Sequence, residues 1–96
     1  PENLVLHFNP RPAQDMFVAC LWSHWQAPNA KDLYSFAAVS DDPPPEIAAA
    51  GHNRCPVALK PENVDAWLSP QKYSSTELLS LLADRQMPYY EHRIAA

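Results

Sequence analysis

Short apolar runs alternate with polar, proline-rich connections along the whole chain. The runs are rich in β-branched and aromatic residues, which is typical of strands. Five strands are predicted, at residues 3–8, 16–22, 33–39, 55–59 and 87–94. The second run is apolar nearly throughout, so we expect it to be buried on both faces. The first is expected to end in a turn at residues 9–12 and to form a hairpin with the second.

Three further segments carry helical signals. Pro45 is the expected first residue of a short alanine-rich helix, because a proline disfavours α geometry in the residue before it and suits the first helical position. Gly51 fits the position after that helix, where a positive φ is wanted. A second helix, with one apolar face, is expected to begin at Pro61. A third should follow the capping-box pair Ser74 and Glu77.

These elements predict an α+β fold with a curved, mainly antiparallel sheet, a partial barrel, and short helices on one side. Ninety-six residues are enough for one small domain at most, so residues 1–96 are interpreted as a single domain or part of one. No apolar run approaches the length of a membrane span, and we expect no membrane partner. The chain opens on Pro1 rather than Met, which favours a trimmed or fragmentary chain.

Charge and cysteine content limit the possible functions. The formal net charge of −4 is unlike that of a stand-alone DNA-binding protein, which normally carries a basic excess. Cys20 and Cys55 lie in or beside apolar strands and are predicted to be buried thiols. No metal or cofactor is expected, because neither cysteine has metal-ligand spacing with a histidine. The histidines are His7, His24, His52 and His92.

The densest group of chemically capable side chains is His52, Asn53 and Arg54. His52 follows the end of the alanine-rich helix, whose dipole favours the imidazolium form, so it is a candidate general acid. Arg54 could grip a phosphate or brace a pocket through an internal carboxylate. The alternative is that His52 is a surface or hydrogen-bonded structural residue.

Two tryptophans, Trp22 and Trp25, allow a stacking hypothesis, since aromatic side chains can take an unstacked base. No basic residues are interleaved with them, so we favour the interpretation that both pack beneath the loop and cap the core. Ser40 before two aspartates has a simpler interpretation, as a turn residue.

Four blocks of the chain occur in the order of a known family. They are a Gly-Leu-Trp-Glu-type turn at residues 17–25, a Ser-Phe-Thr-Ile-type strand at 35–40, a His-Asp-Arg-Met-Pro-type motif running into a strand at 52–59, and a tryptophan-bearing helix at 61–68. In these blocks the chain resembles the C-terminal half of a SOS response-associated peptidase (SRAP) domain. Asn53 stands where the family usually has Asp, and Cys55 where it has Met.

The resemblance implies a sensor of abasic sites in single-stranded DNA. In that family an N-terminal cysteine forms a thiazolidine crosslink with the open sugar, and we expect this cysteine to lie in an N-terminal half outside this chain. Cys20 and Cys55 cannot replace it, because each nitrogen is in an amide. By the same likeness His52 is the catalytic residue, and Arg54, Ser40 and Asn53 contact DNA. The implied localisation is cytoplasmic, with the nucleoid when DNA is bound.

Three hypotheses remain open from the sequence. The chain is the C-terminal part of an abasic-site crosslinking enzyme with peptidase- and lyase-like chemistry, inactive without its N-terminal half. Alternatively, it is a divergent or truncated relative that acts as a binding or interaction module without catalysis. The third hypothesis is an unrelated small α+β protein.

Overall fold

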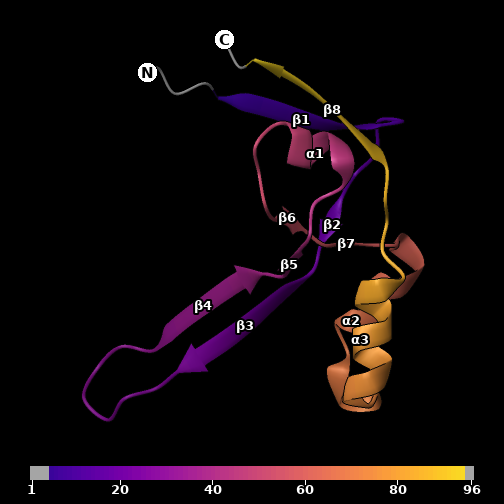
Figure 1. The fold of residues 1–96 in the computed structure, drawn as a ribbon. Coiled ribbons are helices and arrows are strands. Elements are labelled where there is room, and N and C mark those ends of the chain that lie inside the picture. The colour runs from indigo at the N-terminus through magenta and orange to yellow at the C-terminus, as the bar shows by residue number, and fades with distance from the viewer. Residues whose placement is uncertain (1–4, 95–96) are drawn as a thin grey trace.

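The computed structural model describes residues 5–94. It is an α+β structure with antiparallel strand pairs and short helices, which confirms the predicted fold class (Figure 1). The strands are β1 (Leu6–Arg11), β2 (Phe17–Val18), β3 (Cys20–Trp25), β4 (Leu33–Ala38), β5 (Ser40–Asp41), β6 (Cys55–Pro56), β7 (Ala58–Leu59) and β8 (Tyr89–Ile94). The helices are α1 (Pro45–Ala49), α2 (Val64–Trp67) and α3 (Ser75–Ala83), with 3₁₀ turns η1 (Pro61–Asn63) and η2 (Pro70–Lys72).

A ring of three backbone hydrogen bonds lies at the centre of the fold. The amide of Ala19 donates to the carbonyl of Val57 (2.9 Å), that of Val57 to Val39 (2.8 Å), and that of Val39 to Ala19 (2.8 Å). We call these three residues the junction. Each lies in the middle of a segment that changes its pairing partner there, so β2 pairs with β7, β3 with β4, and β5 with β6.

The junction corrects the predicted continuous strands at residues 16–22, 33–39 and 55–59. Each of these runs is divided in two. In the first run, residues 16–22, only the central residue Ala19 is buried, with 0% of its surface exposed. Phe17, Val18, Leu21 and Trp22 are exposed, so burial on both faces was a wrong prediction. An apolar run indicates a strand, but it does not reveal that the strand exchanges partners halfway along.

The first strand also differs from its prediction. β1 continues through the residues expected to form a turn and pairs with β8, from Leu6 opposite Ile94 to Arg11 opposite Tyr89. The predicted hairpin with the second strand is therefore wrong, and residues 3 and 4 lie outside the described part. Pro10 fits within β1 because a two-stranded ladder leaves half of its backbone donors unpaired.

α1 and α3 begin where local signals placed them, whereas the helix expected to begin at Pro61 starts as the 3₁₀ turn η1 and becomes α2 only at Val64. Pro45 opens α1, and Gly51 has φ 99°. Ser74 and Glu77 form the predicted capping box of α3, in which the Ser74 hydroxyl accepts from the Glu77 amide (3.1 Å) and the Glu77 carboxylate accepts from the Ser74 amide (3.0 Å). No helix within residues 5–94 is long and apolar enough to cross a membrane.

The buried core is small and lies around the junction and α1. The buried apolar residues among those described are Ala19, Ile47, Val57, Ala58 and Leu59. Figure 1 shows three bodies extending from this centre: the β3–β4 hairpin, the α2–α3 pair, and the β1–β8 ladder with α1 against it. The radius of gyration is 16.6 Å, whereas a compact domain of this length would have about 12 Å. The chain is therefore open rather than packed upon itself.

The β3–β4 hairpin exposes most of its apolar side chains. Trp22 is 72% exposed and Phe36, directly opposite it, is 80% exposed. Trp25 is also exposed, so the prediction that both tryptophans cap the core is wrong. The reason is geometric: the hairpin extends away from the junction, and α2 reaches only the start of β3, through the Trp67 indole (Figure 1).

Candidate functional site

His52 lies at the rim of an apolar pocket of about 300 Å³. It follows α1 by three residues, and its amide donates to the carbonyl of Ile47 (3.4 Å), which ties the turn to the helix. The side chain is exposed to solvent. The pocket is lined by Phe8, Met16, Val18, Ile47, His52, Arg54, Cys55, Pro56, Ala58 and Tyr90. A titratable ring at the mouth of an apolar hollow is a suitable arrangement for proton transfer to a bound ligand.

The imidazole of His52 has an aromatic neighbour from a distant part of the chain. Its ring centroid is 5.8 Å from that of Phe8 in β1, with an interplanar angle of 77°, an edge-to-face contact. Within residues 5–94, the imidazole makes no hydrogen bond to another side chain or to the backbone. Both ring nitrogens are therefore free to meet a ligand.

Arg54 and Ser40, both named from the resemblance as DNA contacts, bond to each other in the structure. The Arg54 guanidinium donates from Nε to the Ser40 hydroxyl (3.2 Å) and from Nη2 to the Ser40 carbonyl. Ser40 lies in β5, paired with Pro56 of β6. Arg54 thus braces the β5–β6 pair through a hydroxyl and a carbonyl, not through the internal carboxylate that was one of the two predicted roles. Asn53 is exposed beside it.

The cysteines are half-buried rather than fully buried, which corrects their prediction. Cys20 begins β3 beside the junction, and Cys55 lines the His52 pocket. Burial, with a smaller contribution from the negative charge of Glu46, raises the pKa of the Cys55 thiol. A thiol in this state is a poor nucleophile. Among the described residues there is no cluster of His, Cys, Asp and Glu that could hold a metal ion.

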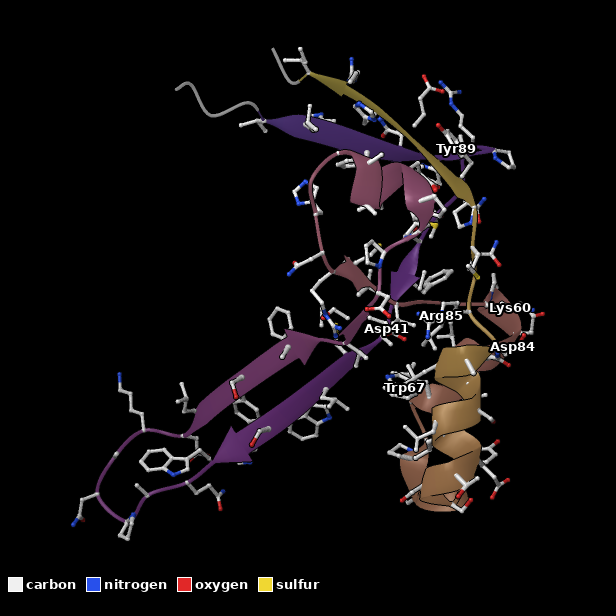
Figure 2. All side chains as sticks on the ribbon, in the orientation of Figure 1. Asp41, Lys60, Trp67, Asp84, Arg85 and Tyr89 are labelled. Carbon is white, nitrogen blue, oxygen red and sulfur yellow. The ribbon has the colours of Figure 1, made fainter. Side chains whose placement is uncertain are left out.

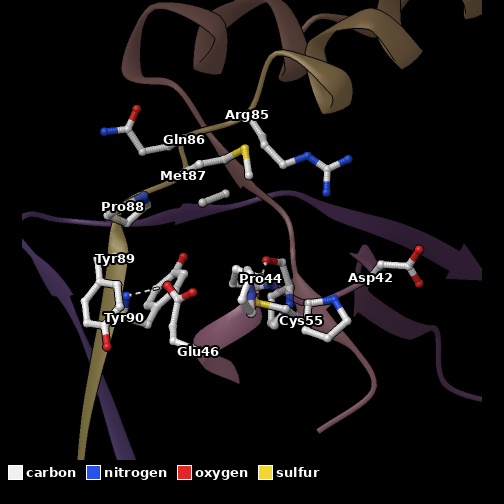
Figure 3. A pocket seen from close by; sticks show the side chains of 14 residues that line it. Asp42, Pro44, Glu46, Cys55, Arg85, Gln86, Met87, Pro88, Tyr89 and Tyr90 are labelled. Carbon is white, nitrogen blue, oxygen red and sulfur yellow. Dashed lines mark hydrogen bonds between the residues drawn. The ribbon is translucent and has the colours of Figure 1, made fainter. Parts of the chain in front are cut away.

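A second hollow, of about 500 Å³, shares the walls formed by Cys55 and Tyr90 with the first. Figure 3 shows it from close by, between the start of α1 and the segment that joins α3 to β8. The carboxylate of Glu46 accepts a hydrogen bond from the amide of Tyr90 (2.9 Å), which fastens α1 to β8. Sequence reasoning missed Glu46 because its partner is 44 residues away and leaves no local signal.

A long-range ion pair fixes the other side of this hollow. Arg85 at the end of α3 bonds Asp41 of β5 at 2.9 Å, and Figure 2 shows the two side chains meeting beside the junction. The hydrogen bond from Arg85, followed by that from the amide of Asp42, lowers the pKa of Asp41. On the same side of the fold, the Trp67 indole donates to the carbonyl of Cys20 (3.1 Å) and anchors α2 to β3.

Most basic side chains are engaged within the chain. Besides Arg54 and Arg85, Arg11 bonds Glu91 (2.6 Å) and Lys60 bonds Asp84 (2.6 Å). These hydrogen bonds lower the pKa values of Glu91 and Asp84. Four of the seven Lys and Arg side chains are thus engaged inside the described part. Three of these positive charges, those of Arg11, Lys60 and Arg85, are paired with carboxylates, so less of the basic charge is available to phosphate groups.

A comparison with protein families gives one match. The family model described as SOS response associated peptidase (SRAP) matches residues 4–95. No curated protein and no solved structure matches the chain. The family match covers nearly the whole sequence, so it concerns the fold and not one motif. It agrees with the resemblance of the four sequence blocks and excludes the unrelated α+β protein that was the third hypothesis.

Proposed function

The chain belongs to the SOS response associated peptidase family, and on this premise we propose that it forms one wall of a site for abasic single-stranded DNA. The covalent step is a thiazolidine crosslink between the open sugar and an N-terminal cysteine on another part of the domain. Cys20 and Cys55 do not take this role, because their nitrogens are amides. This chain contributes His52, which transfers protons during opening of the sugar ring and during reversal of the crosslink.

The observation that carries this proposal is the state of the His52 side chain. It is exposed, its ring nitrogens make no hydrogen bond within the described residues, and it borders a pocket with apolar walls. A structural histidine is usually held by hydrogen bonds to its ring nitrogens, whereas a proton-transfer group must offer one of them to its substrate. The missing hydrogen bonds argue against a hydrogen-bonded structural role, and the place of His52 in the pocket lining supports the catalytic role over that of a surface residue.

The rest of the domain would also cover the exposed hairpin. The solvent-accessible surface is 7529 Å² for a chain of 10.8 kDa, whereas a compact monomer of this mass exposes about 5,500 Å². The excess, on the order of 2,000 Å², is within the roughly 1,000–2,500 Å² that each partner loses in an obligate interface. We assign the N-terminal half of an SRAP domain as the partner, because the hairpin exposes apolar side chains on both faces and needs a surrounding polypeptide.

Contacts with DNA would be made beside His52. Asn53 is exposed and can donate to a phosphate or sugar oxygen, while Arg54 and Ser40 contribute after exchanging part of their mutual contact for the ligand. The remaining positive charge comes from the N-terminal half, because this chain carries a net charge of −4. Such a protein would be cytoplasmic and would associate with the nucleoid when bound to DNA.

An adduct assay tests the proposal. The chain is incubated with single-stranded DNA that carries one abasic site, with and without the N-terminal half of a complete SRAP protein. We expect a covalent, gel-shifted adduct only with both parts present, and at least tenfold slower reversal after His52→Ala. His7→Ala is the matched control, since His7 is exposed on the opposite face of β1 from Phe8 and does not line the pocket. Reversal at the normal rate in His52→Ala would contradict the catalytic role.

A second function, a binding module without catalysis, is favoured by two observations. Asn53 lacks the charge that the family's Asp would offer to His52 or Arg54, and the Arg54 guanidinium is occupied by Ser40. Under this alternative the complemented protein binds abasic single-stranded DNA without forming an adduct. Asn53→Asp should then restore crosslinking if the missing charge is the cause.

A further inference from the structure

The ring of His52 contacts Phe8, a residue near the start of the described chain. Phe8 lies in the middle of β1, on the side of the ladder that is half-buried, and lines the same pocket as His52. α1 contacts β8, so the helix that precedes His52 lies against the ladder that carries Phe8 (Figure 1). This packing brings the two rings into their edge-to-face contact at 5.8 Å.

Phe8 is itself held between two histidines. His92 lies directly opposite it in β8, and their ring centroids are 5.4 Å apart with an interplanar angle of 45°. Residues directly opposite in an antiparallel pair project from the same face of the ladder. His92 therefore supports one side of the Phe8 ring while His52 contacts another, and the C-terminal strand reaches the site through this stack.

No described residue forms a hydrogen bond with the imidazole of His52. Histidines that transfer protons are normally oriented by a hydrogen bond to the second ring nitrogen. Here the neighbouring Asn53 makes no such bond, and the aromatic contact takes its place. An edge-to-face pair has a preferred geometry, so it restricts the tilt of the imidazole and leaves both nitrogens available to the ligand.

We propose that Phe8 is the positioning residue of His52, with an edge-to-face contact in place of an orienting hydrogen bond. The proposal rests on the proposed proton-transfer role of His52 for its effect on the reaction, but its geometric part can be tested without DNA. Phe8 touches no reacting atom in this account. Its function is to hold the ring at the mouth of the pocket.

The first measurement is the NMR spectrum of the His52 imidazole in the whole chain. Wild-type protein should give cross-relaxation between the Phe8 ring and the His52 ring protons, which should also carry ring-current shifts. Phe8→Leu keeps an apolar side chain in the pocket and should remove those shifts, and Phe8→Tyr should restore them. Leu6→Ala, two residues earlier on the same face of β1, is the matched control and should leave the His52 signals unchanged.

The second measurement is crosslink reversal with the N-terminal half supplied. Because misplacement of a reacting group is costly, Phe8→Leu should slow reversal by roughly 10–100-fold. Phe8→Tyr, which keeps the aromatic ring, should recover the rate. Unchanged imidazole signals in Phe8→Leu would overturn the proposal outright. A normal rate in Phe8→Leu beside a slow His52→Ala would also overturn it, while leaving the proposed function intact. If His52→Ala reacts normally, the proposed function fails and the spectra alone decide the role of Phe8.

Discussion

The thiol of Cys55 lies in the wall shared by the two hollows, close to the residue proposed to transfer protons. Burial and the charge of Glu46 raise its pKa, so less of it is thiolate at a given pH. We expect iodoacetamide to alkylate Cys55 at pH 8 at least roughly threefold more slowly than N-acetylcysteine. Mass spectrometry of the Cys55 peptide over time would measure the rate. A rate equal to that of the free amino acid would contradict the assigned environment.

Single residues with local signals were the most predictable part of the chain. Pro45, Gly51 and the Ser74–Glu77 pair were placed correctly because each acts on its own turn of backbone. His52 was placed after a helix end for the same reason. Phe8 was not associated with it, since the contact joins residues that only the complete β1–β8 pairing brings together.

Among the secondary-structure elements, α3 depends on its cap. The capping box satisfies two amides at the helix start, so Ser74→Ala should lower the free energy of unfolding by about 1 kcal/mol. For a domain of this size, the midpoint of thermal unfolding should fall by roughly 4–8 °C. Circular dichroism on heating measures the shift. Ser75→Ala, one residue later and outside the box, is the control, and an equal loss in both variants would show that the cap is not the cause.

The Asp41–Arg85 pair connects β5 to the end of α3, and its effect should depend on pH. The pKa of Asp41 is lowered in the folded chain. Its contribution to stability is therefore present above the unfolded pKa of Asp and is lost as the pH falls through the folded value. Arg85→Gln should lower the free energy of unfolding at pH 7, where the ion pair contributes. At pH 2, where that contribution is largely lost, the same substitution should lower it much less. Urea unfolding at both values measures it.

A matched variant separates the pair from a general charge effect. Lys72→Gln removes the same charge from a residue that forms no ion pair within residues 5–94. It should leave the difference in stability between pH 7 and pH 2 unchanged. If Arg85→Gln behaves in the same way, the ion pair does not hold β5 against α3.

Strand pairing was the part of the fold that the pattern could not supply. The existence of strands near residues 17–25 and 33–41 was predicted from apolar runs, but their exchange of partners at Ala19 and Val39 was not. Pairing is a relation between distant segments, and one linear pattern is compatible with several of them. β1 was assigned to the wrong partner for the same reason, because nearness in sequence favoured a hairpin over β8.

At the scale of the whole molecule, the exposed hairpin explains why the prediction for the tryptophans was wrong. Trp22 and Trp25 have the composition of core residues, and we expected them to be covered. They are exposed here because the three bodies around the junction extend away from one another. Under the proposed function, the N-terminal half of the domain covers this hairpin and its tryptophans.

The central claim is that the N-terminal half of an SRAP domain covers the exposed β3–β4 hairpin. Sedimentation equilibrium tests it most directly, with this chain mixed with the separately produced N-terminal half of a complete SRAP protein. We expect a stable 1:1 complex, weakened at least roughly tenfold when Trp22→Ser and Phe36→Ser remove apolar contact area from the hairpin. A polar control, Ser35→Ala in the same hairpin, should bind normally. Two species that sediment independently, or a complex unaffected by the hairpin substitutions, would contradict the account.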